Sequence, residues 1–230
     1  MILYKYTSFE VAKKILETSS IGFSCPKDLN DPFECTSFGF LKNASYNNSI
    51  STIIDRYKDI FSRNYAILSL TKQPLNSLMW SHYGDSHQGV VIGIDIKEAS
   101  LTDMIISAIP AQYGEVVYSE TKPKDTFDYS AEELLDITLE SVSFESNFYN
   151  VLKRAFLYKS LEWAYEEEAR VVKNIYHPGF NNHSTSGNFN IQSERWNKIK
   201  PNNLGRPVYC LNIPSSSFKE IYIGRLLIFH

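Results

Sequence analysis

The sequence lacks the short patterns that mark several common classes of site. Its three cysteines, Cys25, Cys35 and Cys210, include no CxxC pair, and no HExxH occurs, so neither a zinc site nor a dithiol redox motif is indicated. No GxGxxG follows an expected strand and no GxxxxGKS is present, which argues against dinucleotide-binding Rossmann and P-loop chemistry. A GxSxG nucleophile elbow is also missing, so serine-hydrolase catalysis is not supported.

The chain has no excess of basic residues and no long apolar run. With 23 Lys and Arg against 26 Asp and Glu, its net charge is -3, so a nucleic-acid partner would need a local basic patch. The candidates for that patch are Lys153, Arg154, Lys173, Arg195, Lys198 and Lys200. Surface lysines are more often only a solvated face. No apolar run approaches the ~20 residues of a membrane span, and the MILYKYTS start does not resemble a signal peptide. Because unpaired cysteines are typical of a reducing compartment, we expect a cytoplasmic protein without a membrane partner.

What the sequence does contain is enough apolar material for one packed domain. Of its 230 residues, 43% are hydrophobic and 14% aromatic, and no linker or repeat divides the chain. The expected strands are short and scattered, and they outnumber the expected helices. This pattern predicts a single α+β domain over residues 1–230 with a mixed, mostly antiparallel and possibly split sheet.

The expected elements follow from apolar periodicity and turn residues. Strands are expected over residues 2–6, 21–24, 65–70, 89–96, 116–118, 208–213 and 221–228. Helices are expected over residues 8–18, with Thr7 or Ser8 as N-cap, and in one or two pieces over 130–163. Residues 77–83 are helical or irregular, helical spacing occurs over 53–60, and the polar region 181–205 forms an insertion or lid.

One acidic stretch, YEEEARVV over residues 165–172, admits two interpretations. In a helix, Glu166 and Arg170 are four residues apart and form a solvated pair worth ~0.3–0.5 kcal/mol. In a strand, Glu166, Glu168 and Arg170 share one face, and the two carboxylates repel unless a cation lies nearby or one takes up a proton. The residues alone favour the helix end slightly.

Three further stretches carry candidate site residues. MWSHYGD over residues 79–85 could line a pocket with Trp80, His82 and Tyr83, or form an ordinary aromatic core. Asn30 and Asp31 could face a polar ligand or simply complete a turn. Ser69 and Thr71 place two hydroxyl groups on one face of a strand, which is common in sheets.

Four stretches together resemble a bacterial family known only as domain of unknown function 2971. They are LYKYTS, FSCPKDLNDPFE, LSLT…LMWSHYGDSHQGVVIGID, and Lys159…Trp163-x-Tyr165-Glu166-x-Glu168-x-Arg170. The closing FKEIYIG at 218–224 also resembles that family, so the likeness covers roughly residues 2–225.

This layout is more distantly similar to ADP-ribosyltransferases. The corresponding positions are the first strand Tyr4-Lys5-Tyr6, the hydroxyl motif Ser69-Leu70-Thr71 and the late Glu166-Glu167-Glu168. Those enzymes carry Arg or His on the first strand, where this chain has Lys5, and Thr in the middle of the hydroxyl motif, where this chain has Leu70. The resemblance implies an ADP-ribosyltransferase-like fold with NAD as substrate.

The resemblance also implies roles for individual residues. It implies that Glu168 acts on the ribose, that Glu166 assists substrate or acceptor, and that Arg170 either keeps the carboxylates ionised or binds phosphate. The other implied NAD-binding residues are Tyr4, Lys5, Tyr6, Asn30, Asp31, Ser69, Thr71, Trp80, His82 and Tyr83.

The implied activity is transfer of ADP-ribose to a protein or nucleic acid, as a bacterial toxin or anti-phage effector. Two alternatives stay open at this point. An NAD glycohydrolase would use the same site with water as acceptor. A catalytically inactive nucleotide- or nucleic-acid-binding module would keep the fold and lose the chemistry.

Overall fold

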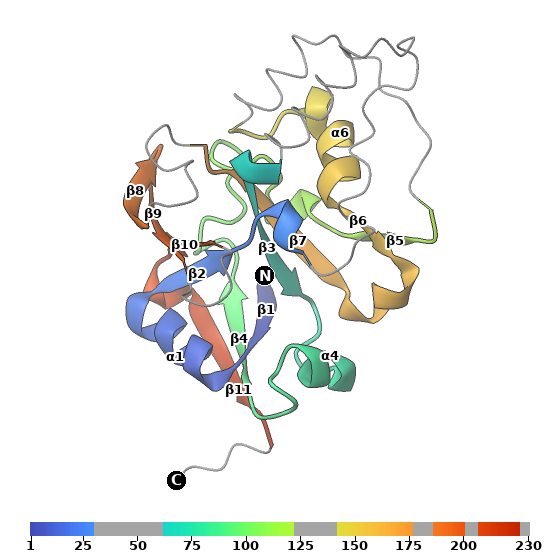
Figure 1. Cartoon of the computed structure of the whole chain (residues 1–230), viewed down its shortest axis with the longest axis vertical. Helices are drawn as coiled ribbons and strands as arrows, with labels where there is room; N and C mark the ends of the chain where they lie inside the picture. The colour runs from blue at the N-terminus through green and yellow to red at the C-terminus, as the bar shows by residue number, and fades with distance from the viewer. Residues whose placement is uncertain (30–61, 122–141, 177–185, 201–206, 226–230) are drawn as a thin grey trace.

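The computed structural model describes residues 1–29, 62–121, 142–176, 186–200 and 207–225. Within them the chain is a mixed α+β structure with mostly antiparallel sheets (Figure 1). The helices are α1 (Phe9–Thr18), α4 (Ser77–His82) and α6 (Ser146–Phe156), and the short 3-10 helices are η1 (Pro26–Asp28), η2 (Ala111–Tyr113), η3 (Leu161–Glu166) and η4 (Ser215–Ser217). The strands are β1 (Ile2–Thr7), β2 (Ser20–Phe23), β3 (Tyr65–Thr71), β4 (Val90–Asp95), β5 (Val117–Ser119), β6 (Tyr158–Ser160), β7 (Glu168–Asn174), β8 (Gly187–Ile191), β9 (Glu194–Ile199), β10 (Val208–Asn212) and β11 (Phe218–Ile223).

The central sheet has five antiparallel strands in the order β11-β4-β1-β3-β7. β1 pairs with β4 along its whole length, whereas β1 and β3 meet at Tyr4 and Thr71. A second antiparallel sheet has the order β2-β10-β9-β8, and β5 and β6 form a small parallel pair. The described residues therefore form two main sheets, as the expectation of a split sheet allowed.

The main core lies between these two sheets, with α1 packed beside them (Figure 1). Because side chains alternate between the two faces of a strand, every second residue points into this core. Leu68 and Leu70 of β3 and Val171 of β7 do so, as does Trp196 of the second sheet. A second cluster buries Phe156 of α6 against the opposite face of β3 and β7. The face of the central sheet turned away from the main core is thus partly covered by α6.

Most of the strand predictions agree with the structure, and so does the first helix. Ser8 is the N-cap of α1, and its side chain accepts a hydrogen bond from the amide of Val11. The helix expected over 130–163 is confirmed by α6 over Ser146–Phe156 and is wrong beyond Phe156, where strand β6 follows. The described part of region 181–205 forms the β8–β9 hairpin, whose Phe189 and Trp196 are buried in the main core.

Candidate functional site

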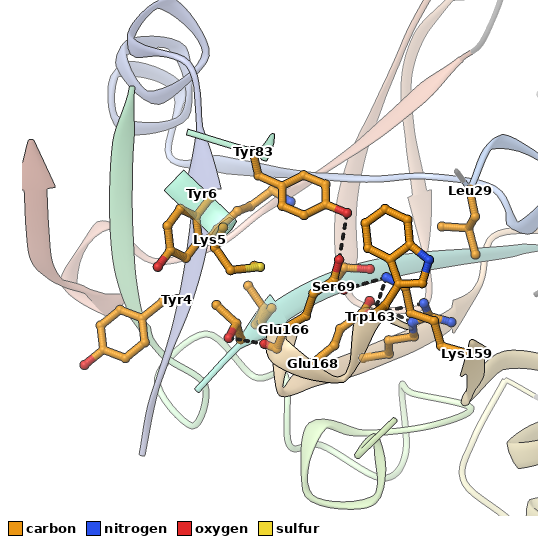
Figure 2. A pocket seen from close by; sticks show the side chains of 14 residues that line it. Tyr4, Lys5, Tyr6, Leu29, Ser69, Tyr83, Lys159, Trp163, Glu166 and Glu168 are labelled. Atoms are coloured by element: carbon orange, nitrogen blue, oxygen red, sulfur yellow. Dashed lines mark hydrogen bonds and ion pairs between the residues drawn. The ribbon is translucent and has the colours of Figure 1, made fainter. Parts of the chain in front are cut away.

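A cavity of about 200 Å³ opens where β1, β3 and β7 meet the end of η3 and the end of α4 (Figure 2). Its lining combines hydroxyl groups, aromatic rings, three cationic side chains and two carboxylates. The lining residues are Tyr4, Lys5, Tyr6, Leu29, Ser69, Leu70, Thr71, Met79, Tyr83, Lys159, Trp163, Glu166, Glu168 and Arg170. It therefore gathers segments that are far apart in the sequence.

Strand register brings the polar side chains of β3 and β7 together. Thr71 is paired with Glu168, and Ser69 with Arg170. Because side chains alternate along a strand, these four share the face opposite the buried residues of the main core. Tyr4 of β1 is paired with Thr71, which extends the row to the first strand.

The acidic stretch combines the end of a 3-10 helix with the start of a strand, so the strand interpretation is confirmed from Glu168 onward. Glu166 ends η3, Glu167 adopts the left-handed conformation with φ 43°, and Glu168 begins β7. The Thr71 hydroxyl donates to the carbonyl oxygen of Glu166 and fixes this turn. The strand interpretation is therefore wrong for Glu166, yet the turn still directs both Glu166 and Glu168 into the cavity, while Glu167 is exposed.

Two cations hold the paired carboxylates. The Lys159 Nζ atom lies 2.5 Å from Glu166 Oε2 and 3.1 Å from Glu168 Oε2. Arg170 donates to Glu168 through Nε at 2.8 Å and Nη2 at 3.0 Å, and its Nη1 donates to the Phe156 carbonyl at 2.6 Å. These four charged residues are at most 7% exposed. Such buried charges are tolerated because each is paired and hydrogen-bonded.

The surroundings of the two carboxyl groups shift their pKa values in opposite directions. Burial alone would raise the pKa of Glu168, but Arg170 and Lys159 outweigh it and lower the pKa to about 2. For Glu166, burial is the stronger influence and raises the pKa above its ordinary value, although Lys159 and the Tyr83 hydroxyl oppose it. Glu168 is therefore a fixed anion, whereas the raised pKa makes Glu166 the better suited of the two to exchange a proton.

Tyrosine and tryptophan side chains form the wall above the carboxylates. The Tyr83 hydroxyl donates to Glu166 Oε1 at 2.7 Å, and dashed lines in Figure 2 mark the hydrogen bonds and ion pairs of the site. The Lys159 ammonium lies 5.1 Å from the centre of the Trp163 ring, within reach of a cation–π contact. The half-buried Tyr83 and Trp163 rings thus offer apolar surface directly beside the ionised groups.

Most of the residues proposed from the sequence lie at this cavity. Tyr4, Lys5, Tyr6, Ser69, Thr71, Tyr83, Glu166, Glu168 and Arg170 all line it. Trp80 is instead buried and packs edge-on against Tyr6, with ring centres 5.4 Å apart. His82 is exposed, and its ring centre lies 6.2 Å from that of Trp163, outside the cavity lining. Asn30 and Asp31 lie outside the described residues.

Sequence reasoning gave no role to Lys159 and Trp163, although both stood in the pattern that carried the family resemblance. Their contribution depends on the turn from β6 into η3, which the expected long helix concealed. Leu29 and Met79 complete the apolar part of the lining. Among the described residues, no group of three or more His, Cys, Asp and Glu side chains is arranged to hold a metal ion. No helix in the same residues is long and apolar enough to cross a membrane.

Residues 79–171 match the family described as Protein of unknown function (DUF2971). The match supports the resemblance expected from the sequence over this segment. The DUF2971 segment supplies Tyr83, Lys159, Glu166, Glu168 and Arg170, that is, all of the cavity's carboxylates and two of its three cations. No curated protein and no solved structure is significantly similar to the chain.

Proposed function

We propose that this chain is an ADP-ribosyltransferase-like enzyme that cleaves the bond between nicotinamide and ribose in NAD and transfers ADP-ribose to a macromolecule. One observation carries the proposal. The first strand, the Ser69–Thr71 strand and the Glu166–Glu168 turn converge on one cavity, with a fixed anion and a proton-exchanging carboxyl group side by side.

The two carboxylates suit the chemistry of that cleavage. When the carbon–nitrogen bond breaks, its electron pair leaves with nicotinamide, and positive charge develops on the ribose ring, as in glycoside cleavage. The ionised Glu168 supplies a preorganised negative charge in a water-poor site, which stabilises this cation. Glu166 then accepts the proton of the incoming nucleophile as the new bond to the ribose carbon forms.

The size and walls of the cavity select which part of NAD enters. A volume of about 200 Å³ is below the ~300–1,000 Å³ of sites that enclose a drug-sized ligand, so it suits one end of the dinucleotide. Tyr83 and Trp163 offer ring surface for the nicotinamide, and the Ser69 and Thr71 hydroxyls offer hydrogen bonds to the ribose. The adenosine end would lie outside this cavity.

A matched pair of variants tests the proposal. Purified protein is incubated with NAD carrying a label on its adenine part, together with mixed protein and nucleic acid, and both free nicotinamide and labelled macromolecule are measured. Glu168→Gln removes the fixed anion, and Glu167→Gln makes the same change at the exposed neighbour. We expect label transfer by the native chain and Glu167→Gln, and none by Glu168→Gln. A folded native chain that releases no nicotinamide refutes the proposal.

The same assay separates transferase from glycohydrolase. Free nicotinamide without labelled macromolecule would show that water is the acceptor. If transfer is observed, expression in a bacterial host tests the proposed role as a toxin or anti-phage effector, because growth arrest should depend on Glu168.

One observation favours a second candidate, a nucleotide-binding module without catalysis. Both carboxylate oxygens of Glu168 are already bonded to Arg170 or Lys159, so the cluster could serve stability alone. A module of this kind would show a melting temperature that rises with NAD concentration, because a ligand selective for the native state stabilises it, and no nicotinamide release.

A further inference from the structure

One cation of the cavity, Lys5, differs from the others in its contacts with the described residues. Lys159 and Arg170 bond carboxylate oxygens, and the buried Lys173 bonds Glu194 Oε1 at 2.7 Å and the Ile106 carbonyl at 2.9 Å. Lys5, which also lines the cavity, makes no hydrogen bond and no ion pair with any residue that the structure describes. A half-buried amine with no acceptor among the described residues is an arrangement that the rest of the site avoids.

The physical consequence is an amine that gives up its proton readily. Burial lowers the pKa of Lys5 below its ordinary value, and the negative charge of Glu168 opposes this only in part. An ammonium group removed from water without a bonded anion is costly, so the neutral form gains population. A neutral lysine amine in a pocket is a nucleophile toward carbonyl carbon.

We propose that Lys5 is a reactive amine that forms an imine with the carbonyl carbon of a small aldehyde or open-chain sugar bound in the cavity. This reactivity goes beyond the NAD chemistry proposed above and does not depend on it. Lys5 sits in the middle of β1, paired with Ile92 of β4, so its backbone is held in place within the central sheet.

The neighbouring groups complete the reaction. The lone pair of Lys5 Nζ forms a bond to the carbonyl carbon as the π bond of the carbonyl breaks, and a proton passes from this nitrogen to the carbonyl oxygen to give a neutral carbinolamine. The carbon–oxygen bond of that intermediate then breaks, and the oxygen leaves as water with a proton from Glu166, whose raised pKa suits it to carry one. The iminium ion that remains is cationic, and the ionised Glu168 stabilises it.

The cavity also restricts the class of ligand. Its volume of about 200 Å³ favours a compact compound, and the Ser69, Thr71 and Tyr83 hydroxyls favour one that carries hydroxyl groups. A short hydroxyaldehyde meets both conditions. We therefore choose D-glyceraldehyde as the probe.

Reductive trapping tests this inference. The native chain is incubated with D-glyceraldehyde and sodium cyanoborohydride, which reduces the imine to a stable secondary amine, and each lysine's modification rate is followed by peptide mass spectrometry. Lys72 is the internal reference, because it is exposed and paired with Glu115 at 2.7 Å. We expect Lys5 to be modified severalfold faster than Lys72, since a lowered pKa raises the fraction of the amine that is neutral.

Two variants test whether the fast modification depends on the Lys5 amine and on the Glu166 carboxyl group. Lys5→Arg keeps the positive charge and should abolish the fast adduct, while Glu166→Gln should slow modification at Lys5 and leave Lys72 unchanged. Modification of Lys5 no faster than that of Lys72 in the native chain overturns the inference, and this comparison needs no variant to fold. Fast trapping at Lys5 without nicotinamide release supports this inference and rejects the NAD proposal, so the two fail independently.

Discussion

Replacing Lys159 by methionine isolates the electrostatic contribution of the cluster. Met is close in length to Lys and keeps most of the apolar packing, but it removes the ammonium that lies 2.5 Å from Glu166 and 3.1 Å from Glu168. The Lys159 side chain is 9% exposed and those of the two glutamates 4% and 5%, so water does not replace the lost cation. Breaking a buried pair in this way typically costs about 3–5 kcal/mol.

The loss of stability caused by Lys159→Met should increase as the pH rises. In the native chain the pKa of Glu166 is already raised, and loss of Lys159 raises it further. As pH rises above the ordinary value of 4.5, Glu166 of the unfolded chain releases its proton before Glu166 of the folded variant does. The unfolded state is therefore favoured progressively until the folded group also ionises. We expect the full loss of about 3–5 kcal/mol near pH 8 and a smaller loss near pH 5, where a larger share of Glu166 is protonated in the folded variant.

Urea unfolding at pH 5 and pH 8 measures the loss in free energy of unfolding at each pH. The melting temperature of the variant should be about 6–20 °C lower than that of the native chain at pH 8. Lys72→Met is the control, since its ion pair with Glu115 is 44% and 77% exposed and should contribute less than about 1 kcal/mol. If Lys159→Met is as stable as this control at pH 8, the lysine does not hold the carboxylates and the electrostatic account of the site is wrong.

The remaining predictions concern the groups that place or tune the carboxylates. Tyr83→Phe removes the donor at 2.7 Å from Glu166, so it should raise the pKa of that group and shift the acid limb of the pH–rate profile to higher pH. Gly114→Ala should cost about 3 kcal/mol in urea unfolding, because an added Cβ would lie 1.7 Å from the Arg170 carbonyl oxygen. Glu167→Gly should raise the free energy of unfolding by about 0.5 kcal/mol, because glycine adopts the left-handed conformation without the usual steric cost.

Each of these has its own control. An unchanged pH–rate profile for Tyr83→Phe would show that the hydroxyl does not tune the proton-exchanging group. Gly22→Ala places a Cβ 2.9 Å from the end of the Val208 side chain, which can rotate away, so it should cost clearly less than Gly114→Ala. Glu167→Val should be destabilising, since a β-branched residue is disfavoured at positive φ, and equal stability of the valine and glycine variants would contradict the argument.

The central sheet could be predicted in part from the sequence because its strands carry their own signal. The apolar run over residues 90–94 and the strand over 65–70 have compositions typical of buried strands, and both are present in the structure. The β8–β9 hairpin escaped prediction because its residues are mostly polar. It is held by the burial of Phe189 and Trp196 in the main core, a contact between segments distant in sequence.

The candidate site was predictable where strand periodicity governs it. Ser69 with Thr71, and Glu168 with Arg170, alternate with buried residues and share a face. Glu166 followed no such rule, because the left-handed conformation at Glu167 ends η3 and redirects the chain within one residue. Glycine, and not glutamate, is the residue that usually adopts this left-handed conformation, so the sequence does not indicate the turn. Lys159 contacts the carboxylates only because β6 and η3 place it beside them.

Some contacts that position the site residues also stabilise the fold. A variant is therefore informative about the chemistry only if it leaves these contacts in place. Arg170 bonds Glu168 and the Phe156 carbonyl, and its amide donates to the Gly114 carbonyl at 2.8 Å, so its loss disturbs β7, α6 and the η2 region together. Tyr83 is different, because it is half-buried and reaches the site through one hydroxyl group. A loss of activity in an Arg170 variant is thus ambiguous between chemistry and stability. A Tyr83 variant can report on the chemistry itself. It does so if its pH profile changes while its free energy of unfolding in urea stays within about 1–3 kcal/mol of that of the native chain.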